Sequence, residues 1–185
     1  YDQDSIRYSY TSLTTPRSEY RYDIATKSAT LLKRDHVPGF EPSLYTTQRV
    51  WAGTGNGVRV PMSIVYKTER FKHDGTNPLL LYAYGSYGAN SDPYFTSSVV
   101  SLLDRGFVFG IAHIRGGNEM GEAWHDEGML LKKKNTFTDF IDCAEHLIAE
   151  KWTSKDRLLI EGGSAGGLLM GAVTNMRPDL FKAVH

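Results

Sequence analysis

The fold of this chain is decided by residues 157–175, which read RLLIEGGSAGGLLMGAVTN. The run Leu158-Leu159-Ile160 is short, branched and apolar, as expected of a strand buried on both faces. The next residues, 162–166, read GGSAG and fit the pattern G-x-S-x-G, in which a serine stands on a sharp turn between a strand and a helix. The pattern predicts that any chemistry of this chain centres on Ser164.

The glycines of this pattern have a steric reason. The turn holds the serine at strained backbone angles, and the residues two before and two after it lie too close to neighbouring backbone for a side chain. Gly162 and Gly166 occupy those two places. The apolar residues from Leu168 to Val173 then predict a buried helix, whose N-terminal dipole would favour negative charge developing near the serine.

The turn has two other interpretations. G-x-S-x-G also occurs by chance in glycine-rich turns, but here a strand precedes it and a helix follows, which is the context that the motif requires. A phosphate-binding loop would need G-x-x-x-x-G-K-[ST], and no lysine follows this turn. We therefore favour a serine nucleophile.

Composition excludes several classes of partner. Among the 185 residues, 21 Lys and Arg balance 21 Asp and Glu, so no overall field favours nucleic acid or an anionic membrane. The only cysteine, Cys143, excludes an internal disulfide framework and is expected to be a buried, inert thiol. The longest apolar runs are too short to span a bilayer. We expect a soluble, cytoplasmic protein.

The first 34 residues predict a small antiparallel β unit. Its strands are expected over Ser5–Ser12, Tyr20–Ile24 and Ala29–Lys33. Such a unit has too little core to be stable alone. Two prolines and Gly39 in residues 35–42 indicate a linker. We therefore expect the chain to divide into residues 1–34, which belong to a β domain, and residues 35–185.

From residue 45 onward the pattern becomes that of an α/β domain. Two β-type runs, Tyr45–Ala52 and Val58–Tyr66, flank the turn GTGNG, which contains the hairpin dipeptide Asn-Gly. Strands then alternate with helices, with strands expected over Leu79–Tyr84, Phe107–Ala112 and Arg157–Glu161 and helices over Ser98–Arg105, Thr136–Lys151 and Ala165–Met176. Alternation of this kind requires parallel strands joined by crossover helices. An antiparallel edge leading into a parallel sheet, with a serine turn after a strand, is the plan of the α/β-hydrolase fold.

The partners of a serine nucleophile are not evident in the chain. In the α/β-hydrolase order an acid and then a histidine follow the serine. Only Asp179 and His185 follow it with suitable chemistry, and Asp179 is better explained as a turn residue beside Pro178. Phe181–His185 is expected to begin another strand. The other five histidines precede the serine and are expected to be structural or solvent-facing, so we expect the acid and the base to be absent from these residues.

A cofactor or a metal is not indicated. His113, Glu119, His125 and Asp126 are ligand types, but no recognised spacing links them. The run Lys132–Lys134 is expected to be a solvated start to the long helix. We predict no cofactor and no metal.

Several motifs together resemble a known family. The chain is similar to the prolyl oligopeptidase family of serine peptidases, and within it to the oligopeptidase B branch. The resemblance covers nearly the whole chain, and its motifs are LYAYGSYG at 81–88, RGG at 115–117, the segment 131–137, GGSAGG at 162–167 and RPDLF at 177–181. It implies a β-propeller capping an α/β-hydrolase domain, so residues 1–34 would be the end of the last propeller blade and residues 35–185 the first part of the catalytic domain, ending shortly after the nucleophile.

The resemblance also implies roles for individual residues. It makes Ser164 the nucleophile, with the Tyr84 hydroxyl and the Ala165 backbone N–H as donors to the oxyanion. A phenol with an ordinary pKa near 10 is a protonated donor at neutral pH; the alternative for Tyr84 is an ordinary aromatic residue at a strand end. Tyr87 matches an aromatic residue lining the substrate pocket. The sequence departs from the family at Asn118, where the glycine run often continues, and the role of that position stays open.

The oligopeptidase B branch implies cleavage of short peptides after Lys or Arg. Carboxylates are then expected in the specificity pocket, and Asp92 is the candidate for binding a neighbouring basic side chain; a solvated loop aspartate is the alternative. An esterase or lipase is a second possibility, because a serine turn and an oxyanion hole serve any acyl transfer. A non-catalytic role in association is a third. Without its base the serine is not activated, so we expect these 185 residues alone to be inactive.

Overall fold

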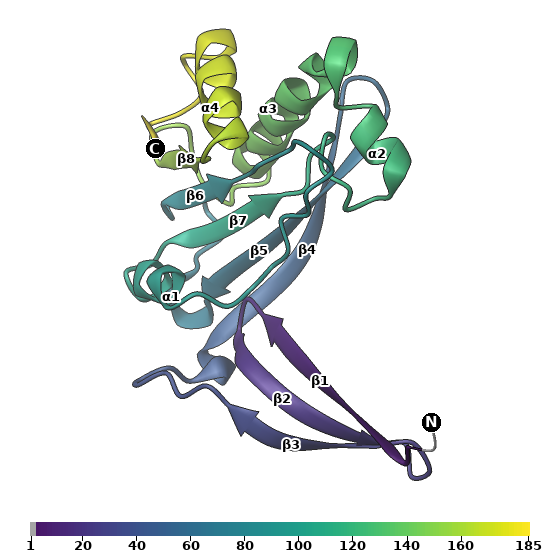
Figure 1. Cartoon of the computed structure of the whole chain (residues 1–185). Helices are drawn as coiled ribbons and strands as arrows, with labels where there is room; N and C mark the ends of the chain where they lie inside the picture. The colour runs from purple at the N-terminus through teal and green to yellow at the C-terminus, as the bar shows by residue number, and fades with distance from the viewer. Residues whose placement is uncertain (1–2) are drawn as a thin grey trace.

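A computed structural model describes residues 3–185, and residues 1 and 2 of the expected first unit lie outside the described residues. Two separate sheets organise the chain, a three-stranded one and a six-stranded one (Figure 1). The small sheet holds β1 (Ser5–Ser12), β2 (Thr15–Asp23) and β3 (Ser28–Arg34), all antiparallel. Strand β2 begins at Thr15, five residues earlier than predicted, because only two residues separate it from β1.

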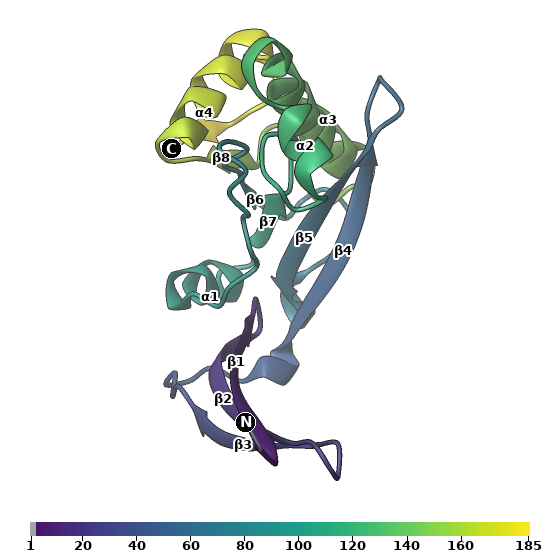
Figure 2. The same ribbon diagram turned by 45° about the vertical axis from the view of Figure 1, so that its right-hand side comes forward.

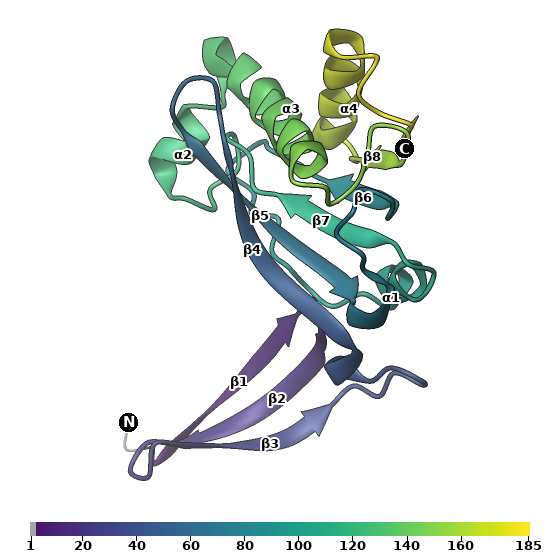
Figure 3. The ribbon, with the colours of Figure 1, turned by 180° about the vertical axis from the view of Figure 1, so that it is seen from behind.

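The larger sheet has the order β4-β5-β7-β6-β8-β9. Its strands are β4 (Tyr45–Gly53), β5 (Arg59–Lys67), β6 (Leu79–Tyr82), β7 (Val108–Ala112), β8 (Leu158–Glu161) and β9 (Ala183–Val184). Strands β4, β5 and β7 pair antiparallel, whereas β7, β6, β8 and β9 pair parallel. The predicted antiparallel edge leading into a parallel sheet is confirmed. Figure 3 shows the long strand β4 along the outer side of this sheet.

Four α-helices accompany the sheet: α1 (Ser97–Asp104), α2 (Glu122–Asp126), α3 (Lys134–Ala149) and α4 (Ala165–Met176). Helices α3 and α4 cover one face, and α1 lies against the opposite face (Figure 2). The short helix α2 was not predicted. Helix α3 begins at Lys134, earlier than predicted, and neither Asn135 nor Thr136 caps it, because the Thr136 hydroxyl donates to the carbonyls of Arg115 and Gly128 instead.

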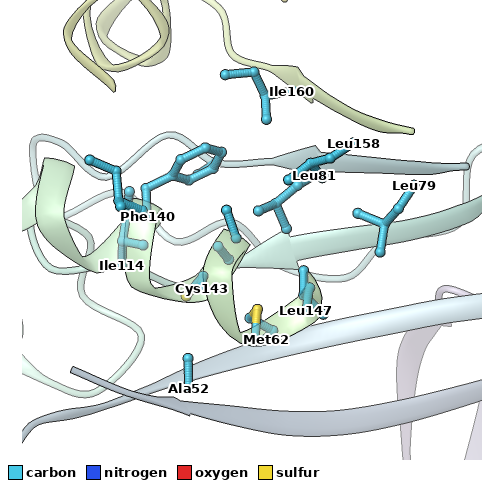
Figure 4. Close-up of a cluster of buried hydrophobic side chains, with 14 of the residues drawn as sticks. Ala52, Met62, Leu79, Leu81, Ile114, Phe140, Cys143, Leu147, Leu158 and Ile160 are labelled. Atoms are coloured by element: carbon cyan, nitrogen blue, oxygen red, sulfur yellow. The ribbon is translucent and has the colours of Figure 1, made fainter. Parts of the chain in front are cut away.

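The main core lies between the sheet and the two helices α3 and α4. Alternate strand residues point into it, among them Met62, Leu81 and Ile160, and they pack against Phe140 and Leu147 of α3 (Figure 4). Alternation follows from the two-residue period of a strand. Of the strand that precedes the serine, Leu158 and Ile160 are buried but Leu159 is only partly so; the expectation of burial on both faces is met on one face alone.

The opposite face is covered more thinly. Phe109, Ile111 and Val65 pack there against Leu103 of α1, and Leu13 from the β1–β2 turn joins them. Cys143 is fully buried and free in the main core, and burial raises the pKa of its thiol well above the ordinary value, which confirms the expectation of an inert cysteine.

Candidate active site

Ser164 stands on a strained turn between β8 and α4. Its backbone has φ 55° and ψ −116°, a combination rarely adopted by a residue with a side chain. Such a conformation costs of order 1–3 kcal/mol and persists only where the surroundings impose it. Here the surroundings are the end of β8 at Glu161 and the start of α4 at Ala165, and the serine side chain is left exposed.

The two motif glycines are required by close backbone contacts. A Cβ on Gly162 would lie 2.6 Å from the carbonyl oxygen of Gly166, and a Cβ on Gly166 would lie 2.8 Å from the carbonyl oxygen of Ala83. Gly163, by contrast, has open space around it. The expected reason for glycine two residues before and two residues after the serine is therefore confirmed.

Tyr84 lies beside this turn. Strands β6 and β8 are parallel neighbours with Tyr82 opposite Glu161, so the residues that follow both strands emerge at the same edge of the sheet. A Cβ built on Gly166 would lie 3.6 Å from the Cα of Tyr84 and 3.8 Å from its ring. The structure thus brings Tyr84 next to the turn of Ser164 and Ala165, from which it is remote in sequence.

The loop after Tyr84 has an unusual backbone. Gly85, Tyr87 and Gly88 all have φ near +60°, and β6 ends at Tyr82, two residues before the predicted end. A Cβ on Gly85 would lie 2.7 Å from side-chain atoms of Ile114 and of Thr136. Tyr87 is 82% exposed, and its ring centroid is 6.4 Å from that of Tyr84.

A buried ion pair lies next to Gly116, which contacts the loop that follows Tyr84. Arg115 donates to Asp139 of α3 through Nε at 2.8 Å and through its backbone N–H at 3.1 Å, and both side chains are buried. The following residue, Gly116, accepts a hydrogen bond from the Gly88 N–H at 3.0 Å. Its φ is +102°, and a Cβ there would lie 2.2 Å from the carbonyl oxygen of Gly85, so only glycine fits.

A groove of about 660 Å³ opens beside Tyr84. It runs over the apolar residues Leu80, Phe109 and Ile111, and Asp92 and Glu161 supply carboxylates to its lining; Ser164 is not among the lining residues. An apolar groove with a few polar groups is typical of a ligand site. Glu161, which the sequence did not single out, is 37% exposed at its side chain.

Asp92 is exposed on the loop between β6 and α1. It accepts a hydrogen bond of 2.8 Å from the Tyr94 hydroxyl, and this bond raises the pKa of Tyr94. The preceding N–H, that of Ser91, donates to Glu119 at 2.9 Å. The structure places Asp92 in the lining of the same groove as Tyr84.

The residues after the serine have other partners. Asp179 accepts two hydrogen bonds from the Arg177 guanidinium, as expected of a turn residue. His185 is 89% exposed, and its Nδ1 lies 3.4 Å from Glu161 Oε1. Within residues 3–185 no histidine is hydrogen-bonded to the Ser164 hydroxyl. That a catalytic acid and base are absent from the chain stays a prediction.

Of the residues considered for a metal, His113 and Glu119 lie together, with Nδ1 3.7 Å from Oε1, whereas His125 makes a separate contact. Ser63 Oγ and His113 Nε2 are 2.8 Å apart, whereas His125 Nδ1 lies 3.1 Å from the Gly116 carbonyl. In the described part of the chain no group of three or more His, Cys, Asp or Glu side chains could hold a metal ion. Among these residues there is also no helix long and apolar enough to cross a membrane.

One contact beside the site escaped the sequence analysis. The run Lys132–Lys134 was expected to be solvated throughout, but Lys133 is half-buried and donates to the Gly85 carbonyl and to the Ser86 hydroxyl, each at 2.6 Å. Nothing in a row of three lysines distinguishes the middle one. Only the fold reveals that its side chain reaches the loop after Tyr84.

The arrangement matches known proteins. A model of the prolyl oligopeptidase family matches residues 93–185. Dipeptidyl aminopeptidase BI of Pseudoxanthomonas mexicana is 52% identical over 98% of this chain. Protease 2 of Moraxella lacunata is 44% identical over the whole of this chain. The structure of oligopeptidase B from Trypanosoma brucei with covalently bound antipain is 46% identical and superposes over the whole chain with a TM-score of 0.91.

The matches also define how much of those proteins the chain represents. It spans 25% of the aminopeptidase, 27% of Protease 2 and 26% of the oligopeptidase B chain. The likeness in structure at this level of identity confirms the mixed α/β fold class expected from the sequence. Because the family model matches half of its residues, the chain belongs to the prolyl oligopeptidase family.

Proposed function

We propose that this chain carries the nucleophile and the oxyanion hole of a serine peptidase that cleaves short peptides after Lys or Arg. The observation that carries the proposal is the strained, exposed Ser164 with Tyr84 packed against the same turn. Ser164 Oγ attacks the scissile carbonyl and loses its proton to a histidine base. The histidine then gives this proton to the leaving amine as the C–N bond breaks, and water hydrolyses the acyl-serine.

The oxyanion of the tetrahedral intermediate is assigned two donors. Tyr84 follows β6 and lies beside the turn, and the Ala165 N–H is the first of helix α4. One preorganised donor of this kind contributes about 3 kcal/mol to stabilisation of the transition state. The helix dipole of α4 acts in the same direction.

The acid and the base are proposed to come from sequence outside these residues. The chain spans about a quarter of its relatives, and the Ser164 hydroxyl has no histidine partner in residues 3–185. We also propose that residues 3–34 belong to a β-propeller and residues 35–185 to the catalytic domain, since the two parts form separate sheets. A single buried thiol suits a reducing compartment, and we propose the cytoplasm.

The preference for basic residues rests on the likeness to oligopeptidase B and on the carboxylates of the groove. Asp92 is proposed to attract a cationic side chain next to the scissile residue, and the exposed Tyr87 ring is proposed to line the substrate path. An exposed carboxylate and ammonium interact by about 0.2–1 kcal/mol. The contribution of Asp92 is therefore a few-fold in kcat/KM, and it shrinks as salt is added.

A second candidate function is release of dipeptides from the N-terminus. The relative at 52% identity is named a dipeptidyl aminopeptidase, and such an enzyme would bind the terminal ammonium close to the scissile bond. The same carboxylates, Asp92 and Glu161, are available for it. Matched substrates with a free and an acetylated N-terminus separate the two functions, because an endopeptidase accepts both.

Three variants of the full-length enzyme, and the 185 residues alone, test the proposal. Ser164→Ala should abolish cleavage of a Lys- or Arg-amide, while the 185 residues alone should show no turnover. Tyr84→Phe keeps the ring and removes one donor, so kcat should fall by about 10² with KM little changed. Asp92→Asn should weaken cleavage of dibasic peptides by a few-fold and leave monobasic ones nearly unchanged. Full activity of Ser164→Ala, or hydrolysis of esters but of no peptide, would overturn the assignment.

A further inference from the structure

The ammonium of Lys133 is bonded to the loop that carries Tyr84. Its Nζ donates to the Gly85 carbonyl and to the Ser86 hydroxyl, and both distances are 2.6 Å. These are the two residues directly after Tyr84. Ser86 is buried, Lys133 is half-buried, and the contact joins segments 48 residues apart in sequence.

The loop cannot hold its shape by local preference. Gly85, Tyr87 and Gly88 are in the left-handed region, which is unfavourable for the tyrosine. Backbone hydrogen bonds fix the far end of this loop, where the Gly88 N–H donates to the Gly116 carbonyl and the Ala89 N–H to the Ser86 carbonyl. At its near end, next to Tyr84, the side-chain bonds are those of Lys133.

A half-buried ammonium is costly unless its bonds offset the loss of water. Burial lowers the pKa of Lys133, and no carboxylate forms an ion pair with it among the described residues. Hydrogen bonds from a charged donor are about twice as strong as neutral ones, so the two bonds to the loop are strong ones. The cost of burying Lys133 is therefore explained by its hydrogen bonds to Gly85 and Ser86.

We propose that Lys133 is a positioning residue of the oxyanion hole, which fixes the Gly85–Ser86 segment and thereby the direction of the Tyr84 hydroxyl. This inference rests on the proposed function. Lys133 itself does not touch the substrate; its effect passes through Tyr84. A displacement of about 1 Å at a reacting group lowers the rate by up to about 10², so loss of the two Lys133 hydrogen bonds should lower kcat about 10-fold.

The test is a double-mutant cycle on the full-length enzyme. Lys133→Met removes the charge and the donors, and Lys134→Met on the same first turn, where the side chain is exposed, is the matched control. We expect Lys133→Met to lower kcat about 10-fold with KM little changed, and Lys134→Met to have no effect. Combined with Tyr84→Phe, the Lys133→Met change should cost less than about 2-fold further, because the donor that it positions is already gone.

Several outcomes would overturn the inference. An equal loss from Lys133→Met in both backgrounds would mean that it acts independently of Tyr84, and a loss no larger than that of Lys134→Met would mean that it does not act at all. Ser86→Ala removes one acceptor and leaves Lys133 in place, so it should show a smaller loss with the same dependence on Tyr84; an additive loss counts against the proposal even if Lys133→Met fails to fold. Failure of the proposed function itself is distinct, since then Ser164→Ala would not abolish activity.

Discussion

Close backbone contacts surround the serine turn, and they make a quantitative prediction for Gly162→Ala. The new Cβ would lie 2.6 Å from the Gly166 carbonyl oxygen, 2.8 Å from its carbonyl carbon and 3.1 Å from the Ala83 oxygen. All three atoms belong to backbone that is held by β6 and α4, so no flexible side chain can move aside. The methyl group has to displace the turn.

The cost of such overpacking is about 1–3 kcal/mol. Gly163→Ala is the matched control, because its Cβ meets nothing within 4 Å and its φ is not in the left-handed region. At a compatible site glycine-to-alanine changes stabilise a protein by about 0.4–1 kcal/mol through the unfolded chain. The two neighbouring substitutions should therefore differ by about 2 kcal/mol or more in the free energy of unfolding.

Thermal unfolding followed by circular dichroism measures this difference. For a chain of this size 1 kcal/mol shifts Tm by about 2–4 °C, so the Gly162→Ala protein should melt about 4–8 °C below the Gly163→Ala protein. In the full-length enzyme, where the serine is activated, Gly162→Ala should also lower the reactivity of Ser164 toward an organophosphorus probe, since the turn that presents the hydroxyl has moved. Melting temperatures within 1 °C of each other would refute the argument that close packing, and not chance, placed glycine at 162.

Two further predictions concern other contacts. Asp139→Asn leaves the buried Arg115 without its counter-charge, so the free energy of unfolding, measured in urea, should fall by about 3–5 kcal/mol. Asp142→Asn on the same helix is the control and should cost little, because burial already raises the pKa of that carboxyl and disfavours its charge. Equal effects of the two substitutions would contradict the role given to the ion pair. Burial and the hydrogen bond to Asp104 raise the pKa of Tyr45 to about 12. The stability that this shift contributes is present below pH 10 and should be lost as the pH rises toward 12, and Tyr45→Phe should remove that part of the loss. Identical curves of stability against pH for both proteins would contradict the prediction.

The local pattern of the chain determined its elements. Apolar runs bounded by glycine and polar turns predicted the strands on both sides of the Asn-Gly hairpin and the strand–turn–helix around Ser164, because these signals depend on neighbours in the sequence. The prediction was wrong at element ends. Strand β6 ends at Tyr82 and α3 starts at Lys134, because the loop after Tyr84 and the bonds of Thr136 are set by residues far away in the chain.

The motif at 162–166 also determined the position of the nucleophile and the need for two glycines. What only the tertiary structure decided is which remote residues surround that serine. Parallel pairing of β6 with β8 brings Tyr84 to the turn, Arg115 and Asp139 support the loop from below, and Lys133 reaches its near end. None of these contacts can be read from the sequence, because a solvated lysine and a lysine buried against a backbone carbonyl are the same residue type. The difference arises from packing between segments that are dozens of residues apart.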